Sequence, residues 1–534
     1  MSKIKEFVEK HIKVTFFVCA AVLSFIIYAQ TIKYDFVHLD DDVLMIDRFQ
    51  TLSDYKVIPS YFYKSVFSTK IDKYFRPVLM VSLAADAILG GLNPAAYHQM
   101  DILLHIFSVF LIFVFLLKLG FDKKICFAFC ALFAVHPVFV QAVAWIPGRN
   151  DTLLAVFVMA SLIFLIDYLN TKRSVYLFSH AFMFLAALLA KETAIVLIVI
   201  IPLMIFTFNK ENYKISEIKK ICFFLLFAAA VYFSLRHAAL HNSRGNIPIV
   251  GSLKYILYAL PSVFQYCDYL INPSSLSMFP VNINIDFFSF IFAFIIFGVP
   301  FILSFLFKQG RKTAVLFGFL WFALFLFPIL ILPPSIYIYM SHRLYLPVIG
   351  IMMMWIECGY LLLKNVSSLL KKSLFLLFAV IFVLFAIAAF YQTKKFQDRS
   401  IFWSNALNDA PESALVMANV GVYYYDNKIY DEAEKYFLKA VSLNSSDFKS
   451  YNNLGSVYML RGDTETALLC FKHSLLINPD YDIALYNLSR FHYHVLGDIE
   501  EAYNLALKAV ALEHENAGYK EYYEKIKKAK SLLQ

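Results

Sequence analysis

Three consecutive carboxylates, Asp40, Asp41 and Asp42, follow shortly after the first long apolar segment of the chain. Ionisable side chains at the end of a membrane helix often mark a functional site. Repulsion among adjacent carboxylates favours the uptake of a proton, so Asp41 or Asp42 could act as a general base. The alternative interpretation is a hydrated loop that only ends the span.

Single cations occur in other loops that the charge pattern places on the same side of the membrane. Arginine offers a phosphate a bidentate fork and lysine offers a point charge, and either can neutralise a phosphate or diphosphate leaving group. A carboxylate base and such cations on one membrane face indicate group transfer from an anionic, lipid-linked donor. The cations concerned are Arg76, Arg149, Lys191 and Arg343.

Three histidines lie in or near apolar segments. His98 and His105 are seven residues apart and therefore share a helix face with Asp101, which permits a proton relay or a metal pocket. Hydrogen bonds between helices are the more common role of such side chains. His136 precedes Pro137 and can form a turn that shapes its helix. All three histidines are supporting candidates for the site.

The composition indicates a polytopic membrane protein. Of the 534 residues, 60% are hydrophobic and 18% aromatic, while only 16% are charged. The formal charge of +9 does not indicate a nucleic-acid partner, because the Lys and Arg residues form short patches between apolar runs. The seven cysteines show neither a disulfide framework nor a metal-binding spacing.

Apolar runs of about span length predict an all-α bundle of about eleven membrane spans. We treat 252–271, which contains Pro261, Gln265 and Asp268, as interfacial or re-entrant, because this keeps Arg311 and Lys312 in the cytoplasm. The predicted spans are 14–32, 95–118, 125–144, 152–169, 175–190, 193–208, 221–239, 287–307, 313–332, 344–363 and 373–391.

The basic loops set the predicted orientation. The first segment has a basic amino terminus and no small-residue cleavage site, so it is expected to remain as a span that starts in the cytoplasm. The acidic loop 33–94 and the carboxyl-terminal part then lie outside the cytoplasm. The cations assigned to the cytoplasm include Lys118, Lys123, Lys124, Lys172, Arg173, Lys219 and Lys220.

From about residue 414 the sequence repeats with a period of 34, which is typical of tetratricopeptide helix pairs. Asn419-Val420-Gly421 recurs as Asn453-Leu454-Gly455 and then as Asn487-Leu488-Ser489. The repeats could bind an acceptor protein or could be purely structural. The predicted domains are a membrane domain over 1-392, a junction over 393-413, three repeats over 414-516 and a capping helix over 517-534.

Several ordered motifs resemble the transmembrane and tetratricopeptide-repeat family of protein O-mannosyltransferases, which belongs to the C-type (GT-C) glycosyltransferase superfamily. They are Asp41-Asp42, Phe75-Arg76-Pro77, Gly90-Gly91-Leu92-Asn93-Pro94, His136-Pro137-Val138, Gly148-Arg149-Asn150-Asp151, Lys191-Glu192 and His342-Arg343-Leu344-Tyr345-Leu346-Pro347.

The resemblance implies an enzyme that transfers a sugar, mannose or another hexose, from a polyprenyl phosphate to Ser or Thr of proteins outside the cytoplasm. Asp41 or Asp42 would be the base, and Arg149, Lys191 and Arg343 would surround the donor phosphate. No cofactor is certain; the sequence leaves open a divalent cation on the aspartates. The supporting residues would be Arg76, His98, His105, His136, Asp151, Glu192 and His342.

The family usually has an acidic residue before the arginine of its last motif, where this chain has His342. This difference leaves the sugar and the acceptor open. The repeat array is short and resembles prokaryotic members of the family more than animal ones, so the expected location is a bacterial inner membrane with the repeats on its periplasmic side. Transfer to a lipid or a glycan is an alternative, and so is a non-catalytic membrane scaffold with partner-binding repeats. A transporter fits less well, because the charged residues lie at the ends of spans and not at their middle.

Overall fold

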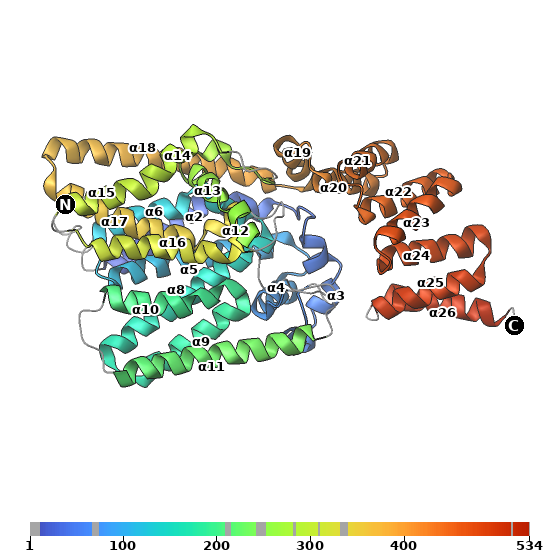
Figure 1. Cartoon of the computed structure of the whole chain (residues 1–534), viewed down its shortest axis with the longest axis horizontal. Coiled ribbons are helices and arrows are strands. Elements are labelled where there is room, and N and C mark those ends of the chain that lie inside the picture. The colour runs from blue at the N-terminus through green and yellow to red at the C-terminus, as the bar shows by residue number, and fades with distance from the viewer. Residues whose placement is uncertain are drawn as a thin grey trace. The chain divides into compact units, whose positions relative to one another are not determined.

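The computed structural model describes residues 11–66, 74–208, 215–241, 253–280, 285–307, 310–331, 340–513 and 516–532. Within these ranges every regular element is a helix and none is a strand, which confirms the predicted all-α class. Contacts divide the chain into one compact unit over Met1–Ile401 and a second over Phe402–Gln534 (Figure 1).

The first unit is an integral membrane domain. Among the described residues, eight helices are long and apolar enough to cross a membrane, and each matches a predicted span. They are Ile12–Lys33, Pro94–Lys118, Ile146–Thr171, Ile215–Leu240, Phe287–Leu306, Lys312–Leu330, Pro347–Asn365 and Ser368–Phe396.

The other three predicted spans are bent or short. The run 125–144 forms the helix pair Lys123–Val135 and Pro137–Ala144, bent by 49°, because Pro137 cannot donate to the preceding turn. Helix α9 (Ser174–Ala190) has 17 residues, which is just below the 18 residues taken here as the minimum for a span. The run Glu192–Phe208, which includes α10 (Leu197–Phe208), is also below this length.

The ambiguous segment 252–271 is not one continuous helix. It forms α12 (Leu253–Ala259) and α13 (Ser262–Ile271), with Pro261 between them. Their lengths of 7 and 10 residues are well below the roughly 20 residues that a crossing needs. This geometry agrees with the interpretation that the segment does not cross the membrane.

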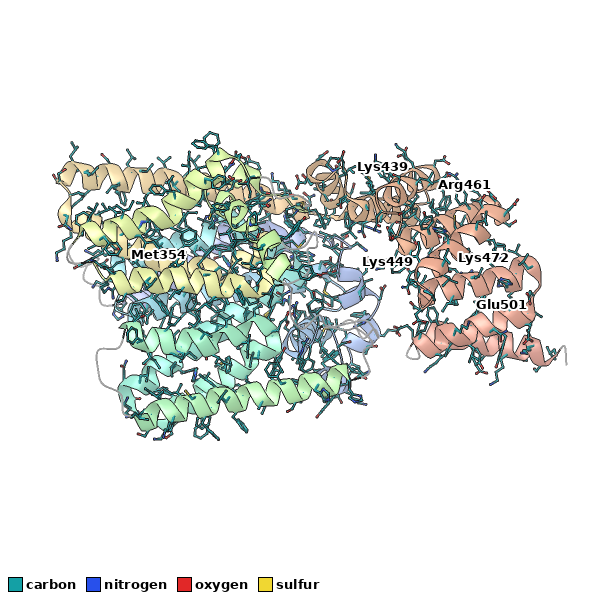
Figure 2. The ribbon with its side chains drawn as sticks, in the orientation of Figure 1. Met354, Lys439, Lys449, Arg461, Lys472 and Glu501 are labelled. Carbon is teal, nitrogen blue, oxygen red and sulfur yellow. The ribbon has the colours of Figure 1, made fainter. Side chains whose placement is uncertain are left out.

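Close helix contacts in the first unit occur where side chains are small. Helices α16 (Lys312–Leu330) and α17 (Pro347–Asn365) approach each other at Gly318 and Gly350. A Cβ atom on Gly318 would lie 2.5 Å from the Gly350 carbonyl oxygen and 2.8 Å from the Met354 side chain. Met354, which belongs to α17, is labelled in Figure 2. Small residues at such positions permit tight packing in a lipid environment, where van der Waals contacts drive association.

An apolar cluster joins the acidic loop to the ends of several helices. Leu44 and Met45 follow the three aspartates and pack with Leu83 of α4 (Pro77–Gly90). The same cluster contains Leu153, near the start of α8 (Arg149–Thr171), and Ala190, the last residue of α9. The loop is therefore anchored beside the residues that begin α8 and follow α9.

The second unit consists of helix pairs with the predicted period. The first described pair is α20 and α21, the next is α22 and α23, and the last is α24 and α25, against which α26 packs. Their bounds are Ala414–Asp426, Tyr430–Leu443, Phe448–Arg461, Thr464–Ile477, Asp482–Phe491, Ile499–Leu512 and Ala517–Ser531.

Glycines allow the paired helices to touch. A Cβ atom on Gly421 would lie 2.6 Å from the Phe437 ring, and one on Gly455 would lie 2.7 Å from the Phe471 ring. In the third repeat, the single inserted residue is absorbed by a π-helical turn, His492–Leu496. Small residues therefore face aromatic side chains in the first two repeats.

Candidate active site

The acidic run lies in the loop between the first span and α4. His38 has a φ of 57°, a left-handed conformation that is uncommon for a residue other than glycine. This conformation brings its Nδ1 atom to 2.6 Å from Asp42 Oδ1, and the hydrogen bond to Asp42 raises the pKa of His38. The Asp42 side chain is 35% exposed, so one carboxylate of the run remains accessible.

Asp41 differs from Asp42 because it is almost completely buried, with 1% of its surface exposed. Its Oδ2 accepts a hydrogen bond of 3.3 Å from the Leu39 backbone N–H. Burial nevertheless raises the pKa of Asp41 to about 7. Asp41 can therefore change its protonation state near neutral pH.

Lys191 forms the centre of a buried ion cluster at the turn after α9. Its Nζ atom lies 2.7 and 2.8 Å from the two carboxylate oxygens of Asp151, in the first turn of α8. Burial lowers the pKa of Lys191 although Asp151 opposes this effect. His342 Nε2 lies 3.9 Å from the second Asp151 oxygen, so three predicted site residues meet here.

His342 is held by Gln141 of the short helix α7 (Val140–Ala144). The Gln141 Oε1 atom lies 3.1 Å from His342 Nδ1 and 3.3 Å from the His342 backbone nitrogen. Burial lowers the pKa of His342 well below its usual value, and the charge on Lys191 acts in the same direction. The imidazole is therefore neutral, and since a carbonyl oxygen only accepts, its proton is on Nδ1.

Arg76 and Glu192 extend this ion cluster. The Arg76 Nε and Nη2 atoms donate to the two Glu192 oxygens at 3.0 and 2.7 Å, a bidentate pair, and the guanidinium lies 4.7 Å from the centre of the Tyr74 ring. The Glu192 side chain is 36% exposed, so this pair is open to a ligand. Arg343 follows His342 and is half-buried.

Arg149 belongs to a different cluster from Lys191. Its guanidinium is fully buried and contacts Asp86 and Asp101, each at 2.5 Å. It also donates to the backbone carbonyls of Tyr97 and Ser82 at 2.8 and 3.3 Å. The guanidinium has no exposed surface in this structure, and the role of Arg149 at the donor phosphate stays a prediction.

Two of the three histidines, His105 and His136, join helices through hydrogen bonds. His105 bonds to the Tyr345 hydroxyl at 2.6 Å and to the Ala134 carbonyl at 3.1 Å. His136 donates from Nε2 to the Leu270 carbonyl at 3.1 Å and accepts at Nδ1 from a backbone N–H. His98 is also buried, and neither of its ring nitrogens has a hydrogen-bond partner among the described residues.

Two residues of these clusters were missed at the sequence level. Asp86 is the lone charged residue of the apolar helix α4, and an isolated acid in such a helix is a signal that the sequence does contain. Gln141 has no comparable signal, because an uncharged amide in an apolar run is common. Among the described residues, no group of three or more His, Cys, Asp or Glu side chains is arranged to hold a metal ion.

Known proteins resemble both units of the chain, the membrane unit and the repeat unit. Tetratricopeptide repeat families match residues 414–447 and 436–468, which confirms the repeats. The mouse protein O-mannosyl-transferase TMTC3 is 22% identical over 431 residues, which cover 72% of this chain and 46% of that protein. Human TMTC2 is 30% identical over 158 residues, or 29% of this chain and 19% of that protein.

Mouse TMTC1 is 29% identical over 195 residues, which cover 32% of this chain and 20% of that protein. The chain thus spans less than half the length of these relatives. Fold and site define a polytopic integral membrane protein with buried ion clusters and a tetratricopeptide-repeat unit. The matches confirm the similarity to the transmembrane and tetratricopeptide-repeat family of protein O-mannosyltransferases.

Proposed function

We propose that this chain is an integral-membrane glycosyltransferase of the C type that transfers a hexose, mannose or another, from a polyprenyl phosphate to Ser or Thr hydroxyls of proteins. The observation that carries the proposal is the cluster around Lys191, Arg76 and His342, beside the loop that holds Asp42. The names of the relatives support the protein acceptor.

In this proposal the donor phosphate binds at Lys191, Arg76 and Arg343. Lys191 and Arg76 carry positive charge in a largely buried setting, where a charge acts more strongly than in water. Asp151 and Glu192 hold the two cations in place before the anion arrives, so little reorganisation is needed. Polar donors arranged in this way stabilise the charge that develops on a leaving phosphate.

The transfer step forms one bond and breaks one bond. The acceptor hydroxyl oxygen attacks the anomeric carbon of the sugar while the bond from that carbon to the phosphate oxygen breaks. The electron pair of that bond leaves with the phosphate, whose charge is stabilised by Lys191 and Arg76. The hydroxyl proton goes to a carboxylate of the acidic loop.

We assign that proton transfer to Asp42, because an acceptor hydroxyl can reach only an accessible carboxylate. Asp42 is 35% exposed and is held by His38. Asp41, which is buried below it in the loop, acts as a supporting carboxylate. The steps described here use no divalent cation. The experiment below therefore includes a chelator, which tests whether transfer depends on such a cation.

The repeats are proposed to recruit the acceptor protein, since tetratricopeptide units form surfaces for protein partners. The alternation of basic loops along the chain supports a site and a repeat unit outside the cytoplasm, which in a bacterium is the periplasmic side of the inner membrane. Lys118, the last residue of α5 (Pro94–Lys118), forms an ion pair with Asp167 of α8 at the ends of these helices opposite to Arg149, so both ends of the helix pair carry charge.

The test is transfer of label from a polyprenyl-phosphate hexose with a radioactive sugar, using the purified full chain in lipid nanodiscs and membrane protein as acceptor. Asp42→Asn should lower the rate by about 100-fold or more, the usual contribution of a general base. Asp40→Asn is the matched control, and the same assay is run with a chelator.

The fraction that gains label separates the alternatives. Label in protein supports the proposal, whereas label only in lipid or glycan indicates that other class of acceptor. If no fraction gains label with the wild-type chain, the protein is a non-catalytic scaffold. Full activity of Asp42→Asn and of Asp41→Asn would remove the acidic loop from the mechanism.

A further inference from the structure

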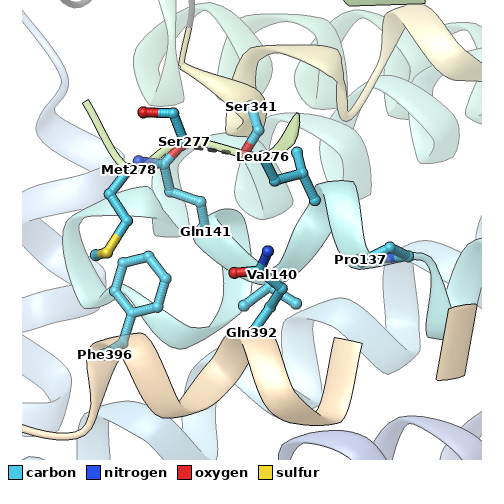
Figure 3. A pocket seen from close by; sticks show the side chains of 9 residues that line it. All are labelled: Pro137, Val140, Gln141, Leu276, Ser277, Met278, Ser341, Gln392 and Phe396. Atoms are coloured by element: carbon cyan, nitrogen blue, oxygen red, sulfur yellow. Dashed lines mark hydrogen bonds between the residues drawn. The ribbon is translucent and has the colours of Figure 1, made fainter. Parts of the chain in front are cut away.

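The pocket in Figure 3 is a small cavity of the membrane unit. It lies among the bent helix pair, the loop after α13 and the end of α18 (Ser368–Thr393), and its volume of about 20 Å³ holds about one water molecule. Within it the Ser341 hydroxyl donates to Gln141 Oε1 at 3.2 Å. A partner larger than water needs an open surface, which the repeat unit provides.

The first helices of the three pairs, α20, α22 and α24, form one face of the repeat unit. They contact one another in this order, and residues 34 apart occupy equivalent places on them. Side chains three or four residues apart on a helix point to the same side. Three rows of residues therefore cross this surface, which we call the inner face: Ala418, Asn452 and Tyr486; Val422, Ser456 and Arg490; and Tyr425, Met459 and Tyr493.

The chemistry of the inner face changes from the first repeat to the third. The first repeat contributes the apolar Val422 where the third contributes the cation Arg490, and it contributes Ala418 where the third contributes the Tyr486 ring. The second repeat contributes the hydroxyl of Ser456 between Val422 and Arg490. One end of the inner face is therefore apolar, whereas the other is aromatic and positively charged.

Two cations gather at the charged end. The Arg490 side chain is exposed, and its guanidinium carbon lies 5.7 Å from the centre of the Tyr486 ring. Lys525 of α26 is also exposed, and its Nζ atom lies 5.6 Å from the centre of the Tyr493 ring. Burial lowers the pKa of His494 and the charges of Lys525 and Arg490 act in the same direction, so both cations lie near one imidazole.

Neither Arg490 nor Lys525 has a carboxylate partner among the described residues of the repeat unit. Arg461 differs, because Asp431 and Glu434 of α21 bind its guanidinium. A guanidinium that lies beside an aromatic ring keeps its N–H donors available, and these donors match a carboxylate in geometry and in charge. The charged end is therefore suited to an acidic ligand.

The inner face has the width of a short extended chain. Burial raises the pKa of Tyr425 and the charge of Arg490 acts against this rise, so side chains of α20 and α24 share one surface. Packed helices lie about 8–10 Å apart, so three of them span about 20 Å, which about six residues of an extended chain cover. The charge of Asp426, next to Tyr425, makes the first repeat unfavourable for an acidic side chain.

We propose that the inner face binds an extended, acidic segment within the acceptor protein. Neighbouring Asp or Glu side chains of this segment pair with Arg490 and Lys525, and an apolar side chain packs against Val422 and Tyr425. The inference rests on the recruitment of a protein acceptor proposed above. Two cations on different helices fit two neighbouring acidic side chains better than the single carboxylate of a chain end, so the segment is an internal one.

The experiment measures the binding of short fluorescent peptides to the purified full chain in lipid nanodiscs at low salt. The first peptide has blocked ends, an apolar residue, a threonine and two consecutive acidic residues, and the second has Asn and Gln in place of the acids. The acidic peptide should bind about tenfold more tightly, because hydrogen bonds between charged groups are stronger than those to a neutral amide. High salt should reduce the difference.

Substitutions at the charged end test the assignment of the two cations. Arg490→Gln and Lys525→Gln should each remove about fivefold or more of the preference for the acidic peptide. Lys472→Gln is the matched control, because Lys472 (Figure 2) is also an exposed cation but belongs to α23, the second helix of its pair. In the transfer assay, Arg490→Gln should raise the KM for an acidic acceptor and leave kcat unchanged.

The outcomes separate this inference from the proposed function. Equal affinity of the wild type for the two peptides overturns the inference, and so does a preference that survives in both variants. A third peptide, with a free carboxyl end and no acidic side chain, should bind as weakly as the neutral one, and tight binding of this peptide would overturn the internal segment. A wild type that binds the acidic peptide but transfers no sugar would contradict the proposed enzyme and leave the acidic-segment surface standing.

Discussion

Two buried cations of the membrane unit, Arg149 and Lys191, have opposite surroundings. Arg149 is enclosed by two carboxylates and two backbone carbonyls, with none of its surface exposed. Lys191 has one carboxylate partner, Asp151, and shares its surroundings with the second cation Arg76. Acidic charge dominates around Arg149, whereas positive charge at least balances the carboxylates around Lys191.

The difference shows how similar residues acquire different tasks. The contacts of Arg149 join α4, α5 and α8, so its charge is used to hold three helices together. The Arg76–Glu192 pair beside Lys191 is partly exposed, so an incoming anion can compete there with Glu192. A cation can bind a ligand only where its protein partners leave part of its charged group exposed.

The sharpest test of this comparison is Lys191→Met. Transfer from the lipid-linked donor should fall by about 100-fold or more, because a donor to the leaving phosphate is lost. The melting temperature should fall less than in an Arg149 variant, because loss of Lys191 leaves one buried carboxylate, Asp151, without its partner, whereas loss of Arg149 leaves two. Both quantities are measured on the same nanodisc preparation, and normal transfer by Lys191→Met would place the phosphate elsewhere.

Arg149→Met should mainly affect stability. Removing the cation leaves Asp86 and Asp101 buried without a partner, which costs about 3–5 kcal/mol. Thermal unfolding in detergent measures the loss. The triple variant Arg149→Met, Asp86→Asn and Asp101→Asn should recover most of it, and a triple variant as unstable as the single one would contradict the ion-pair explanation.

The burial of Asp41 in the acidic loop, beside the Lys191 cluster, can be tested through the pH dependence of stability. Because burial raises the pKa of Asp41 to about 7, the folded chain holds a proton that the unfolded chain has lost between about pH 4 and pH 7. The stability that comes from the proton bound by Asp41 in the folded chain is fully present at low pH and is lost as the pH rises through about 7. Asp41→Asn should therefore be more stable than the wild type at pH 8, by on the order of 4 kcal/mol, and not at pH 4.

The control is the free energy of unfolding of Asp40→Asn, measured at pH 4 and at pH 8. An equal stabilisation by Asp40→Asn would show that general repulsion in the acidic run, and not the burial of Asp41, is responsible. A wild type whose unfolding curve does not depend on pH in this interval would contradict the buried position of Asp41.

The smallest expected effect concerns Glu192. Glu192→Gln keeps a hydrogen-bond acceptor for Arg76 and removes the negative charge that competes with a donor phosphate. Binding of bare polyprenyl phosphate should become about two- to fivefold tighter, the range of a partly exposed ion pair. Asp86→Asn is the counterpart in the Arg149 cluster and should leave this affinity unchanged, so an equal gain in both variants would remove the distinction between the clusters.

Much of the fold could be predicted because its signals are local. Apolar runs of span length and the 34-residue period depend on short stretches of sequence, and both appear in the structure. The His136-Pro137 turn was also readable, since proline acts on its own helix. The lengths of α9 and α10 were harder, because an apolar run does not report where the Lys191-Glu192 turn divides it.

The amino-acid sequence by itself determined the class of the molecule: a membrane bundle followed by helical repeats, with acids and cations at the ends of its spans. Only the tertiary structure decided which cation meets which carboxylate. Arg149 and Asp101 are 48 residues apart and Lys191 and Asp151 are 40 apart, so the spacing of the two pairs is alike. Helix packing brought Asp86 to Arg149 as a second acid and enclosed that guanidinium completely, whereas the Arg76–Glu192 pair beside Lys191 keeps exposed surface.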